Sequence, residues 1–491
     1  MNRRHFLMGM AASTGMAMMP RVSHAFPSVF PHGTTIYKPE KCQSGFTVFG
    51  VETAGQGCVL IDMNGNVVKE WKHVSELEHP TKILKGGYVM GATRQKPDMK
   101  GRTYADPMSA DLSICDFDGK IVRNIPLAGM HHDYQVASNP TGYYTPTQDV
   151  LFEPDKNILV LSHLFTTPEK NGYTFTSKSP LDDDYIFEVD KDNNVVWDYL
   201  FSDHFDEMPF DDAFKETLRK FPTWQMTRTP GVKAADWIHC NSMSKLGPNH
   251  WYTEDPVKYS AFHPDNIIVS NRQTQTSFII DKKTKKIVWH IGPDYYSDSV
   301  WYLNGEPQKG RALGRLGQIV GQHHTHMIPE GLPGAGNIMI YDNGGYSGYG
   351  PRNPASPTGW SNSRRDYSRV IEFNPVTLEK VWEHSAATMG LREGYKFYSD
   401  YVSSAQRLPN GNTLITNGAV GQFQEVTPDN EIVWEYISPW YNPNGKFNLV
   451  YRAYRVPYDY VPQIKKPEEY AVTPPENAEW RIPASKTPYK G

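Results

Sequence analysis

Short runs of alternating apolar and polar residues recur along the chain, each divided by a polar turn. Six copies share one pattern, in which an apolar strand is followed by a turn and by a second strand that ends near an aromatic residue. Alternation on both sides of a turn is typical of a β-hairpin. The six predicted hairpins lie at residues 59–71, 113–125, 186–199, 278–291, 370–384 and 423–436.

The second strand of each copy carries a large side chain at one repeated position, tryptophan in five copies and arginine at or next to it in the second. These residues are Trp71, Arg123, Trp197, Trp289, Trp382 and Trp434. A further predicted hairpin precedes five copies, at residues 79–92, 131–163, 239–271, 323–344 and 403–418. Four strands per unit, repeated six times, predict an all-β fold, a six-bladed β-propeller of four-stranded blades. A β-sandwich does not explain six copies in register.

The first copy lacks an inner strand of its own, because residues 45–50 supply one strand only. The run LVYRAYRVP at residues 449–457 has the character of a strand. We expect this C-terminal strand to join the N-terminal blade and close the ring, which removes exposed sheet edges. Residues 26–491 then form a single propeller domain.

Helix signals are few. Residues 207–221 predict a short helix after Pro209, with Asp211 or Asp212 near its N-cap. Long insertions that follow the second strand of a blade or join two blades share one face of a propeller, so we expect them to roof the central channel. They lie at residues 93–111, 164–184, 200–236, 292–322, 344–366 and 385–401.

Composition excludes several classes of protein. The chain has 491 residues with 50 Lys plus Arg and 54 Asp plus Glu, and this balance argues against a nucleic-acid-binding surface. It has no apolar run of about 18 residues, so no membrane-spanning helix is expected. Its four cysteines form no CxxC pair, which leaves a zinc ribbon unsupported. The pattern leaves the disulfide state of Cys42 and Cys58 open and favours a buried free thiol for Cys240.

The N-terminus has the pattern of an export signal. Arg3 and Arg4 precede Phe6, Leu7 and a short apolar stretch rich in Gly and Ala. This pattern predicts a twin-arginine signal peptide over residues 1–25, cleaved after Ala25. The protein is then expected in the periplasm, with the twin-arginine export machinery as a partner.

Histidines recur where the predicted inner strands begin. Inner strands line the axis of a propeller, so residues at one repeat position converge on a small space. Imidazole can act there as acid, base, nucleophile or metal ligand. The residues aligned at or near this position are His79, His132, His239, His323 or His324, Ser403 or Ser404, and Arg452 from the C-terminal strand.

The chemistry of this predicted site stays open at this point. Three convergent imidazoles suit zinc or manganese, so a divalent metal is possible. The nearby carboxylates, Asp133 and Asp236, flank His132 and His239 and can instead orient their rings. The sequence contains no P-loop, GxSxG motif or dinucleotide fingerprint, and no cofactor is expected unless the site binds a divalent metal.

Several segments resemble one family. Residues 236–242, DWIHCNS, are similar to the DWxHxNS motif of the bacterial periplasmic arylsulfotransferases. Gln322-His323 resembles the QH motif of that family and Tyr367-Ser368-Arg369 its SR motif. Residues 33–41 and 450–459 also resemble its shorter relatives. The resemblance spans the mature chain and implies a six-bladed propeller that transfers a sulfuryl group from an aryl sulfate to a phenol without a nucleotide donor.

The resemblance also implies roles for residues. His239 and His323 would act as acid/base and oxyanion partners, and Arg369 would neutralise the sulfuryl oxygens. We expect Arg452, Asn241 and His79 to contact the aromatic substrate.

The family uses a histidine nucleophile, yet the matching region here, residues 401–411, contains no histidine. His132, His324 and His384 are therefore candidates for this role. The alternative function is a metal-dependent propeller lyase or hydrolase that uses the same ring of histidines.

Overall fold

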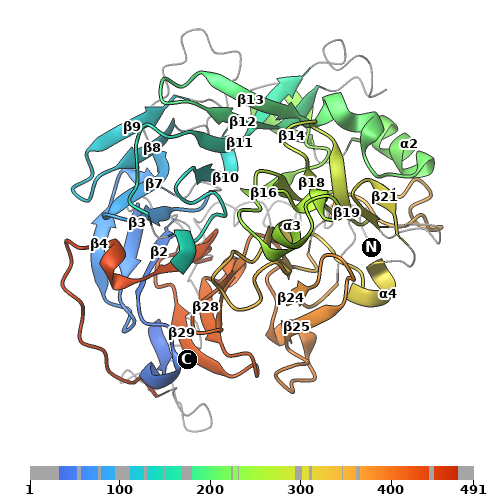
Figure 1. Cartoon of the computed structure of the whole chain (residues 1–491). Helices are drawn as coiled ribbons and strands as arrows, with labels where there is room; N and C mark the ends of the chain where they lie inside the picture. Colours follow the sequence, from blue (N-terminus) through green and yellow to red (C-terminus); the bar gives the residue numbers. More distant parts are fainter. Residues whose placement is uncertain are drawn as a thin grey trace, which may run out of the picture.

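The computed structural model describes residues 32–51, 57–75, 79–93, 111–126, 130–148, 150–166, 180–222, 225–229, 232–293, 301–308, 312–345, 347–360, 365–441 and 447–473. The expected signal peptide, residues 1–25, lies outside them. Six antiparallel sheets surround a central axis, each built on four strands (Figure 1). The prediction of an all-β, six-bladed propeller is confirmed.

The first blade combines segments from both ends of the chain. Its strand order is β30-β2-β3-β4. The bounds are Ala453–Val456 for β30, Phe46–Gly50 for β2, Cys58–Ile61 for β3 and Val67–Trp71 for β4. Val456 pairs with Phe46 and Ala453 with Phe49, so the C-terminal strand lies in one sheet with three N-terminal strands.

The second and third blades follow in chain order. The second contains β6 Lys82–Leu84, β7 Tyr88–Thr93, β8 Asp111–Cys115 and β9 Ile121–Ile125, and β5 Val74–Ser75 also pairs with β7. The third contains β10 Met130–Val136, β11 Ile158–Thr166, β12 Leu181–Val189 and β13 Val195–Leu200. A hairpin of β14 Gln225–Thr229 and β15 Val232–Ala235 attaches to β12 of this blade.

The remaining blades carry extra strands at two outer edges. The fourth contains β16 Cys240–Lys245, β17 Ile267–Asn271, β18 Thr276–Ile280 and β19 Ile287–Ile291, then β20 Tyr302–Leu303 and β21 Glu306–Pro307. The fifth contains β22 His323–Met327, β23 Ile338–Asp342, β24 Arg369–Phe373 and β25 Lys380–Ser385. The sixth contains β26 Ser404–Arg407, β27 Thr413–Asn417, β28 Gln422–Val426 and β29 Ile432–Ile437, with β1 Gly33–Tyr37 beside β29.

The described helices are short. The predicted helix within 207–221 is α2, Asp212–Lys220, and the side chain of its N-cap Asp211 accepts a hydrogen bond from the backbone N–H of Phe214 at 2.7 Å. The other α-helices are α3 His250–Glu254 and α4 Ala312–Leu316. The 3-10 helices are η1 Pro39–Lys41, η2 Pro146–Gln148, η3 Phe201–Glu207, η4 Ser260–Phe262, η5 Gly394–Lys396, η6 Gly418–Val420 and η7 Tyr458–Tyr460. No helix within the described ranges combines the length and apolar character needed to cross a membrane.

The repeated tryptophan position links each blade to the next. Each indole N–H donates to a backbone carbonyl in the following blade's outer hairpin turn. These bonds are Trp71 to Phe117 at 3.0 Å, Trp197 to Lys282 at 2.8 Å, Trp289 to Pro375 at 2.9 Å, Trp382 to Pro428 at 2.9 Å and Trp434 to Met63 at 2.8 Å. In the second blade, Arg123 donates to the Asp190 carbonyl at 2.5 Å. The six links run around the whole ring.

Three of the cysteines, Cys42, Cys115 and Cys240, are free thiols. Cys58, Cys115 and Cys240 are buried, and Cys42 is partly exposed. The prediction for Cys240 is confirmed.

Candidate functional site

Strand pairing shows which inner-strand residues are equivalent. In each blade, one inner-strand residue pairs with the equivalent residue at or near the start of the second strand. These inner-strand residues are Ile83, Val136, Lys245, Met327, Arg407 and Arg455. The position four residues earlier is held by His79, His132, Asn241, His323, Ser403 and Tyr451. The sequence alignment is therefore right for His79, His132 and His323. It is wrong for His239, which lies two residues before the repeat position.

An irregular backbone nevertheless brings His239 to the site. The register of β16 shifts between Cys240 and Ser242, and His239 has a φ of 52°. Residues other than glycine rarely adopt this left-handed conformation, which is concentrated at functional sites. The His239 ring lies edge-on to the His132 ring, with centroids 4.7 Å apart.

His132, His239 and His323 form what we call the histidine cluster. Asp236 Oδ2 lies 2.5 Å from Nδ1 of His239, and Asn343 Oδ1 lies 2.8 Å from Nδ1 of His323. These partners favour a proton on Nδ1, which leaves Nε2 of both rings as the acceptor nitrogen. All three histidines are buried.

His323 interacts electrostatically with Arg272 and with His239, another member of the cluster. Burial lowers the pKa of His323 well below its ordinary value, and the positive charge of Arg272 adds to this effect, with a further contribution from His239. A buried His323 of lowered pKa is a neutral imidazole at neutral pH.

Sequence reasoning missed Arg272. It follows β17, in the turn between the second and third strands of the fourth blade, and its backbone N–H donates to the His239 carbonyl at 3.0 Å. It is 9% exposed. One sequence feature could have identified Arg272 as a site residue. It is an arginine in a short turn, at a place where other blades have long insertions.

Arg369 makes its contacts elsewhere. Its Nε donates to Asp342 Oδ2 at 2.8 Å, its Nη2 to the Gln318 carbonyl at 3.3 Å, and Glu383 lies 3.9 Å away. Within the described part of the chain, no hydrogen bond or ion pair joins Arg369 to the histidine cluster.

Arg452 is fully buried and bonds to residues next to the cluster. Its guanidinium donates to Asp133 Oδ2 and to the Asn241 carbonyl, both at 2.7 Å, and Asp133 also binds Lys82 at 3.0 Å. Tyr451 OH donates to the same Asn241 carbonyl at 3.0 Å, and its ring lies 5.5 Å from that of His132. Asp133 thus pairs with cations rather than orienting the His132 ring.

The other predicted residues lie outside the histidine cluster. His324 Nδ1 accepts a hydrogen bond from the Ala405 N–H at 3.3 Å, and its ring lies near those of His326, Tyr143 and Tyr454. His79 Nε2 lies 3.2 Å from the Met130 carbonyl. Asn241 Nδ2 donates to the Gln322 carbonyl at 2.7 Å and so ties two neighbouring inner strands together.

His384 is not part of the site. It lies on β25, the outermost strand of the fifth blade, where its Nδ1 donates to Asn430 Oδ1 at 2.8 Å and its ring packs edge-on to Phe397. The structure does not support it as the nucleophile, because two strands, β23 and β24, lie between it and the inner strand β22 of its blade.

His384 gives a test of stability against pH. Burial lowers its pKa to about 4, so the unfolded chain binds this proton more readily than the folded protein. The resulting stabilisation is complete above about pH 6.5 and is lost as the pH falls toward 4. We expect wild-type protein to lose about 1–2 kcal/mol more between pH 7 and pH 5 than His384→Gln. Urea unfolding at both pH values measures this, and equal losses in the two proteins would contradict it.

One group of described side chains is close enough to share a metal ion. It comprises His131, His163 and Asp184, beside the histidine cluster rather than within it. Sequence reasoning did not select these three residues, and the possibility that the ring histidines hold a metal stays a hypothesis.

Comparison with known proteins defines the class of protein. The model of the family "Arylsulfotransferase (ASST)" matches residues 108–442, more than half of the chain. This chain belongs to the arylsulfotransferase family. No curated protein matches it.

Solved propeller structures are distantly similar. A protein of unknown function from Bacteroides caccae is 12% identical, with a TM-score of 0.41 and coverage of 84% of this chain and 98% of the other. A putative 6-phosphogluconolactonase from Bacteroides fragilis is 11% identical, with a TM-score of 0.33 and coverage of 85% and 100%. A streptogramin B lyase structure is 11% identical, with a TM-score of 0.34 and coverage of 84% of each chain. Similarity at this level carries no conclusion about function.

Proposed function

We propose that this protein transfers a sulfuryl group from an aryl sulfate to a phenolic acceptor at the histidine cluster. Family membership gives the general type of reaction. The observation that supports this site is the contact of His132 with His239, whose Nδ1 faces the buried carboxylate of Asp236. His323, a neutral imidazole, lies within the electrostatic reach of Arg272.

We assign the nucleophile to His323 Nε2. In the first half-reaction this nitrogen bonds to sulfur, the bond from sulfur to the aryl oxygen breaks, and the leaving oxygen keeps the electron pair. Protonated His239 gives its proton to that phenolate. In the second half-reaction His239 Nε2 takes the proton of the acceptor phenol, whose oxygen bonds to sulfur as the N–S bond breaks. Both imidazoles then return to their starting states.

Positive charge would stabilise the transferring group. Sulfuryl transfer concentrates negative charge on the equatorial oxygens, and a guanidinium in a water-poor site stabilises such charge strongly. Arg272 is the guanidinium that acts on His323. His132 supplies a further ring nitrogen beside His239.

Mass spectrometry tests this function. Protein held with an aryl sulfate is expected to gain the mass of one SO3 group, and peptide mapping should place it on His323. An adduct on His132 would assign the nucleophile to another member of the histidine cluster, and an adduct on His324 would contradict the proposed site. Full turnover without an adduct, lost on chelation and restored by a divalent ion, would favour a metal-dependent lyase or hydrolase instead.

A separate prediction concerns which arginine, Arg272 or Arg369, stabilises the sulfuryl group. Arg272→Lys is expected to lower kcat/KM by about 100-fold, because an ammonium group cannot reproduce bidentate contact with sulfuryl oxygens. Arg369→Lys is the matched variant, and we expect it to change thermal stability more than turnover. A larger kinetic effect from Arg369→Lys would restore the assignment based on the SR motif.

Export is proposed from the N-terminal pattern. Arg3→Lys combined with Arg4→Lys is expected to leave the protein in the cytoplasm, because the twin-arginine machinery reads this pair. Fractionation and immunoblotting measure the distribution. Normal periplasmic levels of the double variant would contradict the twin-arginine signal, and wild-type protein found in the cytoplasm would contradict the periplasmic location.

A further inference from the structure

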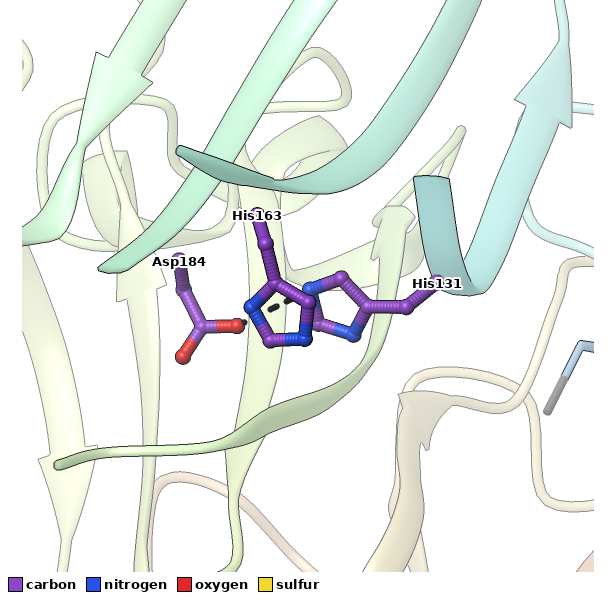
Figure 2. A group of neighbouring side chains, drawn as sticks. All are labelled: His131, His163 and Asp184. Atoms are coloured by element: carbon purple, nitrogen blue, oxygen red, sulfur yellow. Dashed lines mark ion pairs between the residues drawn. The ribbon is translucent and has the colours of Figure 1, made fainter. Parts of the chain in front are cut away.

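Three buried, metal-ligating side chains come from neighbouring strands of the third blade. His131 lies on β10, His163 on β11 and Asp184 on β12, and they are 3%, 5% and 0% exposed. One ligand atom from each lies within 4.8 Å of the other two. Figure 2 shows the two imidazole rings overlapping, with the Asp184 carboxylate beside them. The proposed transfer reaction assigns no role to these residues.

We propose that His131, His163 and Asp184 bind one divalent transition-metal ion, of which Zn²⁺ suits the group best. His131 Nε2 and Asp184 Oδ1 are 3.1 Å apart. Two ligands held about 2.0–2.1 Å from one tetrahedral ion are separated by roughly 3.3 Å. Two imidazoles and one carboxylate are typical of zinc, whereas Ca²⁺ and Mg²⁺ prefer oxygen ligands.

Neighbouring polar groups lie close to further atoms of these side chains. His131 Nδ1 lies 2.5 Å from His132 Nδ1, and Asp184 Oδ2 accepts a hydrogen bond from the Cys240 N–H at 2.9 Å. Asp182 Oδ1 lies 3.6 Å from His163 Nδ1. Metal-ligating histidines characteristically use their second nitrogen in this way, which fixes the ring and its tautomer.

The two rings must reorient to share an ion. They are stacked with centroids 3.5 Å apart and planes 7° from parallel. A metal ion lies in the plane of each imidazole that binds it, since the nitrogen lone pair lies there. Metal binding therefore tilts the rings out of the parallel stack, and Asp182 and Asp184 place negative charge beside the ion.

The ion would influence the histidine cluster through His131. An imidazole bound through Nε2 keeps its proton on Nδ1, so His131 then donates to His132 Nδ1. His132 in turn carries its proton on Nε2 and acts as a hydrogen-bond donor. This role matches the proposed transfer, in which His323 rather than His132 bonds to sulfur, but the metal site itself does not depend on that reaction.

Metal analysis of the purified full-length protein tests the site. Protein stripped with dipicolinate, incubated with Zn²⁺ and dialysed is expected to retain one ion per chain. His163→Gln and Asp184→Asn are each expected to weaken Zn²⁺ binding by about 100-fold or more. The matched controls are Asp183→Asn, a buried neighbour that accepts from Trp237 and Ser202, and His384→Gln, and both should retain the ion.

Two outcomes would overturn the site: wild-type protein that retains almost no zinc, or both variants binding as much zinc as wild type. X-ray absorption of the zinc-loaded wild type needs no variant and covers the case in which a variant fails to fold. Imidazole and oxygen scatterers support the site, while sulfur scatterers would place the ion at a cysteine and refute it. Neither readout uses turnover, so failure of the sulfuryl-transfer proposal leaves this test intact.

Discussion

Replacing His239 or His323 with alanine is expected to lower turnover of an aryl sulfate by about two to four orders of magnitude. In the proposed reaction His239 carries the proton between the two phenols, and its Nδ1 lies 2.5 Å from the buried Asp236 carboxylate. His323 presents a neutral imidazole whose pKa is lowered by burial and by Arg272. Steady-state kinetics with a chromogenic aryl sulfate measures both effects.

The controls separate chemistry from folding. His384→Gln removes a buried histidine on the outermost strand of the fifth blade and should leave turnover within about twofold. Adduct formation distinguishes the two catalytic roles: His323→Ala should abolish the adduct, whereas His239→Ala should slow its formation and decay. Normal turnover in either alanine variant would remove that residue from the mechanism.

Deleting residues 450–491 is expected to abolish soluble folding. The deletion removes β30, which pairs with β2 along the first blade, and also the buried ion pairs of Arg452 with Asp133 and Arg455 with Glu425. It further removes buried apolar side chains, each worth about 1.5–3 kcal/mol, against a net stability of about 5–15 kcal/mol. The exposed β2 edge would then promote aggregation. These apolar side chains include Val450, Tyr451, Tyr454, Val456, Tyr460 and Val461.

Complementation provides the control for this deletion. Residues 447–473 expressed in trans should recover part of the soluble protein, because they contain β30 and Val472, which pairs with Tyr37. The measurement is soluble yield, followed by melting temperature by differential scanning calorimetry. A truncated protein with an unchanged melting temperature would show that β30 does not hold the ring together.

Tertiary geometry decided the composition of the site. Sequence alignment placed His239 at the repeat position, but Asn241 holds it, and a register shift with a positive φ brings His239 against His132. Arg369 matched a motif, yet Asp342 binds its guanidinium, while the turn after β17 places Arg272 near His323. The group of His131, His163 and Asp184 shows no pattern in the sequence, because three separate strands supply it.

The sequence by itself determined the number of blades, the hairpins and the inner-strand positions of His79, His132 and His323. Each of these follows from alternation of side chains along a strand and from the spacing of turns, which are local properties. The repeated position of Trp71 and its equivalents could be predicted for the same reason. Their role in linking successive blades is seen only in the folded ring. Only the tertiary structure decided which charges act on which imidazoles, because backbone irregularities and side-chain direction depend on contacts between residues far apart in the chain.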